Sequence, residues 1–177
     1  MARRKKNAER SMEVGLDHED KRALWRTVMV SSLVLGAILT VLYILLEKVF
    51  PNNPGWLNAS RTGLSLLAFW MVITATIRTY ERVREGVAFF WLIIIGVASA
   101  ALGIFLFLLA LRVWNELGNH GATLPAYSII GFYAAGGLVA SLISLIHLRV
   151  DGEHNGNLLE LLVIAVAVAL FFWFTKG

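Results

Sequence analysis

Five ionisable side chains lie close together in the sequence between residues 147 and 160, namely His147, Asp151, Glu153, His154 and Glu160. Imidazole and carboxylate groups are common zinc ligands, and a spacing of four would place two of them on one side of a helix. The spacing matches no established metal motif, however, and the Asp-Gly and Asn-Gly pairs within the segment are ordinary turn residues. We therefore predict a solvated turn without a metal. His147, Asp151, Glu153 and His154 are the candidate ligands if a metal does bind.

The rest of the sequence contains few groups that could do chemistry. Cysteine is absent, which excludes disulfides, thiolate metal sites and cysteine catalysis. The sequence has no phosphate-binding glycine loop, nucleophile elbow or zinc-protease histidine pair. No charged residue or histidine stands near the middle of a long apolar run, where such residues mark ion paths and proton relays. We predict no catalytic residue and no cofactor. The same observation argues against a proton-coupled pump and less strongly against a channel.

The composition is that of a membrane protein. Of the 177 residues, 58% are hydrophobic and 16% are charged, whereas soluble domains have about 45–50% and about 25%. A helix needs roughly 20 apolar residues to cross a hydrocarbon core of about 30 Å. We predict an all-α, multi-pass transmembrane helical bundle over residues 24–177. Its five predicted spans cover residues 24–46, 62–77, 87–111, 126–148 and 158–174.

The stretch 61–114 organises this prediction, because it joins two apolar runs through one short charged turn at 78–86. Of the sixteen Lys and Arg residues, eight precede residue 27, three lie in this turn and one is Arg149, which makes twelve on one side of the membrane. Cytoplasmic loops carry the excess of Lys and Arg. We therefore expect a cytoplasmic N-terminus and an external C-terminus.

Residues 1–23 are predicted to be a polar, basic, poorly ordered cytoplasmic tail, because their apolar content is too low to bury a face. The cluster Arg3, Arg4, Lys5 and Lys6 could contact anionic lipid headgroups. The role that we expect for it is only to orient the first span. The net charge of +4 does not indicate nucleic acid, since most of it lies in this segment and at 78–86.

Small residues recur on one face of three predicted spans. Small side chains let helix backbones approach closely in lipid, where no hydrophobic drive brings helices together. The fourth span has the densest such face, which predicts that it is the innermost helix. The predicted helix-packing residues are Ser32, Gly36, Thr40, Gly96, Ser99, Gly103, Ala134, Gly137, Ser141 and Ser144.

Two sequence patterns resemble a family of small four-helix bacterial inner-membrane proteins of unknown function. One is Thr76-Ile-Arg-Thr-Tyr-Glu-Arg82 followed by Gly86 and a long third helix, and the other is Gly137-Leu-Val-Ala-Ser-Leu-Ile-Ser-Leu-Ile146. The resemblance covers residues 25–148. The chain departs from the family in its short second outer loop and its added fifth span. The resemblance implies a bacterial membrane bundle and no site residues.

Three functions are compatible with these observations. We expect a non-enzymatic integral membrane protein, an accessory or scaffold subunit that packs against other membrane helices or against copies of itself. The alternative is a small transporter or channel subunit with the fourth helix lining the path. An enzyme is the third, and it would depend on the cluster between His147 and Glu160.

Overall fold

The fold is known from a computed structural model. It describes residues 18–49, 54–84, 87–117 and 129–149, together with positions 158, 159, 161, 162, 163 and 165.

The described chain is helical, and four helices are long and apolar enough to cross a membrane. They are α2 (His18–Val49), α3 (Pro54–Val83), α4 (Phe89–Glu116) and α5 (Ile129–Arg149). An all-α bundle with four of the predicted spans is thus confirmed. The fifth predicted span, 158–174, lies largely outside the described residues, although the six positions described within it are all helical.

Two helices extend beyond the predicted spans into segments that we predicted as a tail and a turn. α2 begins at His18, so residues 18–23 belong to a helix and not to the predicted tail. Glu19 and Asp20 in its first turn interact favourably with the positive end of the helix dipole. α3 continues to Val83, through most of the turn predicted at 78–86. Arginine and glutamate are good helix formers, so a change from apolar to charged residues does not by itself end a helix.

The N-terminal end of α3 also lies in a segment that was expected to be a loop. The helix begins at Pro54, eight residues before the predicted span. Proline is well suited to the first helical position, because the backbone N–H that it lacks would have no partner there.

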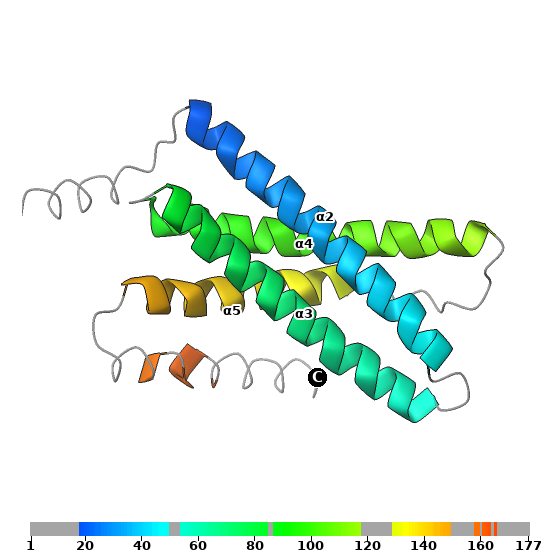
Figure 1. Ribbon diagram of the computed structural model, residues 1–177. Helices are drawn as coiled ribbons and strands as arrows, with labels where there is room; N and C mark the ends of the chain where they lie inside the picture. The colour runs from blue at the N-terminus through cyan, green and yellow to red at the C-terminus, as the bar shows by residue number, and fades with distance from the viewer. Residues whose placement is uncertain are drawn as a thin grey trace, which may run out of the picture.

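The four helices form a bundle in which α4 contacts each of the other three (Figure 1). α3 also contacts α2 and α5, whereas no contact between α2 and α5 occurs among the described residues. Half of the apolar window of α4 is buried, compared with 39% for α5. The prediction that the fourth span is innermost is therefore wrong. Among the described residues α5 packs against α3 and α4, whereas α4 packs against all three other helices.

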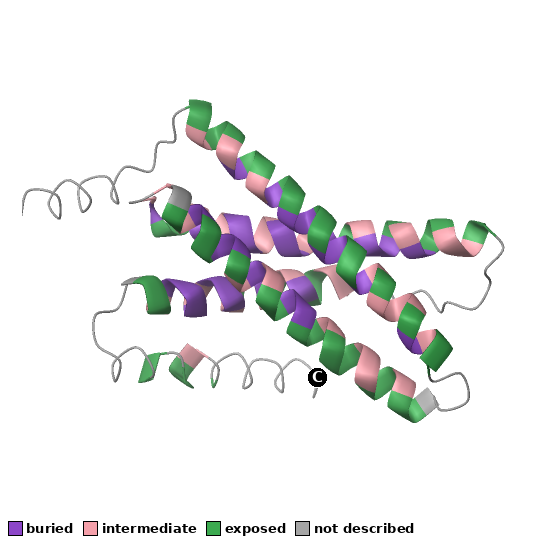
Figure 2. Ribbon diagram, in the orientation of Figure 1, coloured by how far each residue is buried: buried purple, intermediate pink, exposed green. Residues whose placement is uncertain are grey.

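Burial follows the facing sides of the helices, and the outer faces are exposed and apolar (Figure 2). Val28, Leu35, Ile73, Ile95 and Leu111 have no exposed surface. Exposed large hydrophobic residues occur along the outside of all four helices. An apolar exterior around a tightly packed interior is the surface expected of a protein surrounded by lipid.

α2 and α4 begin, and α3 and α5 end, at the same end of the bundle (Figure 1). We call it the basic end. It is defined by the exposed residues Lys21, Arg22, Arg26, Arg78 and Arg82.

Candidate functional site

The interface between α2 and α4 depends on two glycines that face each other across the helices. A Cβ atom built on Gly36 would lie 3.1 Å from the carbonyl oxygen of Gly103 and 3.1 Å from the Cβ of Leu106. A Cβ on Gly103 would lie 2.7 Å from the side chain of Leu35. The two helices therefore approach to a distance that a larger side chain at either glycine would prevent.

The interface between α4 and α5 is built in the same way on another face of α4. A Cβ on Gly137 would lie 2.8 Å from both the Cβ of Ala100 and the carbonyl oxygen of Gly96. A Cβ on Gly96 would meet the hydroxyl of Ser141 and lie 3.2 Å from the carbonyl oxygen of Gly137. At Gly137 both obstructing atoms are fixed to the α4 backbone, so no flexible side chain could move aside there.

The structure brings the predicted small-residue faces together. The face of the first span meets that of the third, and the face of the fourth span meets another side of the same third span. Eight of the ten predicted packing residues are buried, namely Ser32, Gly36, Gly96, Ser99, Gly103, Gly137, Ser141 and Ser144. Thr40 and Ala134 are half-buried.

Buried serine hydroxyls add polar contacts to the α2–α4 interface. The Ser31 hydroxyl donates to the Ser99 hydroxyl at 2.8 Å, and the Ser32 hydroxyl reaches the backbone carbonyl of Ser99 at 3.3 Å. The carbonyl of Val28 on their own helix is also within hydrogen-bond distance, 3.1 Å from the Ser31 hydroxyl and 2.6 Å from the Ser32 hydroxyl. A hydroxyl has one proton, so each serine donates to one of its two neighbouring acceptors at a time. Ser31 was missed in the sequence because it stands outside the every-fourth-residue pattern of Ser32, although a second serine beside it was a usable signal.

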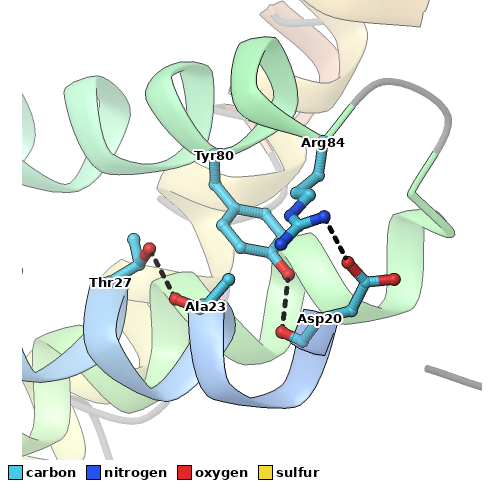
Figure 3. A network of polar contacts seen from close by, with 5 residues as sticks. All are labelled: Asp20, Ala23, Thr27, Tyr80 and Arg84. Carbon is cyan, nitrogen blue, oxygen red and sulfur yellow. Dashed lines mark hydrogen bonds and ion pairs between the residues drawn. The ribbon is translucent and has the colours of Figure 1, made fainter. Parts of the chain in front are cut away.

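A second polar contact group joins α2 and α3 at the basic end (Figure 3). Arg84 Nη1 lies 3.0 Å from Asp20 Oδ1, and both side chains are about one third exposed, at 36% and 32%. The Tyr80 hydroxyl, in a residue that is only 2% exposed, donates a long hydrogen bond of 3.4 Å to the backbone carbonyl of Asp20. Figure 3 shows the side chains of Tyr80 and Arg84 directed at the first turn of α2.

A matching contact group ties the same two helices at the opposite end. Arg61 Nη2 lies 3.2 Å from Glu47 Oε2, and its guanidinium carbon lies 3.7 Å above the Tyr43 ring. Tyr43 in turn packs edge-on against Phe107 of α4, with ring centroids 5.7 Å apart. The Arg61 side chain is only 12% exposed. Each end of the α2–α3 hairpin is thus closed by an arginine–carboxylate pair.

Sequence reasoning singled out neither end contact as a site. Asp20 belongs to the predicted tail, and Tyr80 and Arg84 belong to the predicted turn. The available signal was an acidic residue in the first turn of an extended helix, opposite arginines that follow the next apolar run. Because Asp20 is already paired and Tyr80 bonds to a backbone carbonyl, this contact group is suited to joining helices and not to acid–base chemistry.

Only one of the four candidate metal ligands lies in the described part of the chain. His147 is exposed near the end of α5, and Asp151, Glu153 and His154 lie outside the described residues. No group of three metal-ligating side chains occurs among the residues that the structure describes.

Comparisons with protein-family models, curated proteins and solved structures found no match for the chain. The resemblance of residues 25–148 to the four-helix family therefore stays a prediction.

Proposed function

We propose that the protein is a non-enzymatic integral membrane protein of the bacterial inner membrane, an accessory or scaffold subunit whose helices pack against other membrane helices. In this proposal the basic end faces the cytoplasm, because Lys and Arg concentrate on the cytoplasmic side of membrane proteins. The four apolar helices and their apolar outer surface support the membrane setting.

The observation that carries the proposal is a pair of small-residue faces left exposed on the outside of the bundle. On α3, Gly55, Ala59 and Gly63 recur every four residues and are all exposed. On α5, Gly131 and Ala135 have the same spacing and are also exposed. A Cβ built on Gly63 or Gly131 would meet nothing within 4 Å.

Such faces favour a helix partner over lipid. Inside the bundle, glycines at Gly36, Gly96 and Gly137 are the positions where two backbones come closest. The exposed glycines offer the same possibility to a helix from outside. α3 is also the least apolar of the four candidate spans, so lipid alone solvates it least well.

Site-specific photo-cross-linking in native membranes tests the proposal. A photoreactive amino acid at Leu67 or Leu138, both exposed beside the small-residue faces, is expected to yield a discrete protein adduct. The same probe at Leu33, exposed on α2, serves as the control for lipid contact. Gly63→Leu should remove the adduct at Leu67 by blocking close approach. Lipid adducts alone at all three positions would contradict the proposal.

A small transporter or channel subunit is the second candidate, and one observation favours it. Ser141 and Ser144 are buried on α5, at 0% and 1% exposure, and the Ser144 hydroxyl has no hydrogen-bond partner among the described residues. A path along α5 would use such hydroxyls. Proton entry into liposomes reconstituted with the purified chain distinguishes the two candidates. If the protein is a scaffold subunit, we expect no proton entry. Proton entry that His147→Ala abolishes would favour the transporter or channel and contradict the scaffold proposal.

A further inference from the structure

Five exposed cations at the basic end have no partner in the described structure. Lys21, Arg22 and Arg26 project from the first turns of α2, and Arg78 and Arg82 from the last turns of α3. None of them makes an ion pair or a hydrogen bond with a described residue. We call these five residues the cationic face.

The two helices that carry the cationic face are held side by side. Asp20 pairs with Arg84 and accepts the Tyr80 hydrogen bond, so α2 and α3 are joined at this end. The Asp20 carboxylate is therefore already paired with a cation outside the cationic face. Within each helix the arginines are four residues apart, at positions 22 and 26 and at positions 78 and 82, a rise of about 6 Å along one side.

Exposed apolar surface follows directly beyond the cations on both helices. Trp25, at 62% exposure, stands between Arg22 and Arg26, and Met29 is 53% exposed one turn further on. On α3, Met71 is 56% exposed on the side of the helix that carries Arg78. Cations followed by an indole ring and then aliphatic side chains match the order of a phospholipid, from its phosphate through the interface to its acyl chains.

The described residues at the opposite end of the bundle form no comparable face. Its most enclosed cation, Arg61, is neutralised by Glu47 and covered by Tyr43. Lys48 and Arg112 are the exposed cations described there. The charge asymmetry therefore distinguishes one membrane leaflet from the other.

We propose that the cationic face binds the phosphate headgroups of anionic phospholipids in the leaflet at the basic end, and prefers them to zwitterionic phospholipids. The proposal rests on the membrane setting of the proposed function but not on any protein partner. Polybasic segments beside a membrane span bind anionic lipid through this type of attraction.

Lipid binding to the purified full chain in a neutral detergent provides the test. Energy transfer from tryptophan to dansyl-labelled phosphatidylglycerol or phosphatidylcholine measures each affinity. We expect tighter binding of phosphatidylglycerol, with a contribution of about fivefold per cation. Replacing Arg22, Arg26, Arg78 and Arg82 together by Gln should weaken phosphatidylglycerol binding at least about twentyfold and leave phosphatidylcholine binding unchanged. Raising the salt concentration should also weaken phosphatidylglycerol binding.

The matched control removes cations from the opposite end, with Lys48→Gln and Arg112→Gln in one chain, and should change phosphatidylglycerol affinity less than about twofold. Circular dichroism checks that each variant is folded. If the quadruple variant does not fold, the variants Arg22→Gln/Arg26→Gln and Arg78→Gln/Arg82→Gln provide the test separately. Equal affinity of the native chain for the two lipids, unchanged affinity in the folded variants, or an equal loss in the control would overturn the proposal. A negative cross-linking result would leave this measurement unaffected, since it uses the isolated chain.

Discussion

The closest contact between α4 and α5 gives the sharpest prediction about stability. At Gly137 a Cβ atom would lie 2.8 Å from both the Ala100 Cβ and the Gly96 carbonyl oxygen. An ordinary van der Waals contact begins near 3.4 Å, so the helices must separate locally by about 0.6 Å (3.4 − 2.8). Both obstructing atoms are fixed to a backbone, so no rotamer change relieves the contact.

The expected change in the free energy of unfolding is the difference between two opposing effects of Gly137→Ala. Overpacking a well-packed interior typically costs about 1–3 kcal/mol, whereas glycine to alanine in a helix returns roughly 0.5–1 kcal/mol. Gly137→Ala should therefore lower the free energy of unfolding by about 0.5–2 kcal/mol. Gly137→Leu should lower it further, because a longer side chain forces a wider separation.

The control lies six residues earlier on the same helix. A Cβ at Gly131 meets nothing within 4 Å, so Gly131→Ala should leave the isolated chain equally stable or slightly more stable. Reversible unfolding in mixed detergent micelles, followed by tryptophan fluorescence, measures both variants. Adding Ala100→Gly to Gly137→Ala should restore part of the loss, because it removes one of the two obstructing atoms. Equal stability of Gly137→Ala and Gly131→Ala would refute the close approach of α4 and α5.

Two further predictions concern other contacts, and a third concerns the number of spans. Ser99→Ala removes the hydroxyl that pairs with Ser31 and should cost about 0.6 kcal/mol and at most about 1.7 kcal/mol in the same unfolding assay; no loss would show that the interhelical bond is not formed. Asp20→Asn breaks a partly exposed ion pair with Arg84 and should lower the free energy of unfolding by less than about 1 kcal/mol. Cysteine cross-linking between α2 and α3 at the basic end should nevertheless become less efficient. Unchanged cross-linking efficiency would contradict the role of Asp20 in joining the two helices. A reporter fused after Gly177 should be external if the chain has five spans, and a cytoplasmic reporter would indicate an even number.

The four helices could be predicted from apolar runs because lipid requires each span to satisfy its own backbone hydrogen bonds. Their ends could not, since helices continue into water as long as the residues tolerate helical geometry. His18–Ala23 and 78–83 are such continuations. Hydropathy reports where the hydrocarbon core ends, and that boundary is a different physical limit from the end of a helix.

The small-residue faces could be read from the sequence, but not which face meets which. Gly96 and Gly103 are seven residues apart and would be assigned to one stripe, yet Gly96 approaches α5 while Gly103 approaches α2. The sequence could not assign them, because partner choice depends on where the other helices lie around α4. The long-range pairs Asp20–Arg84 and Glu47–Arg61 escaped prediction for the same reason, since each depends on the crossing of two helices.

The serine contacts between α2 and α4 also have a consequence for the order of events during synthesis. Ser31 and Ser99 are 68 residues apart, and α3 lies between them in the chain. At about 5–20 residues per second, Ser31 has been made roughly 3–14 seconds before Ser99. During that interval the hydroxyls of Ser31 and Ser32 can remain bonded to the carbonyl of Val28 on their own helix. α2 can therefore reside in the bilayer before its partner α4 arrives, with both hydroxyls already satisfied.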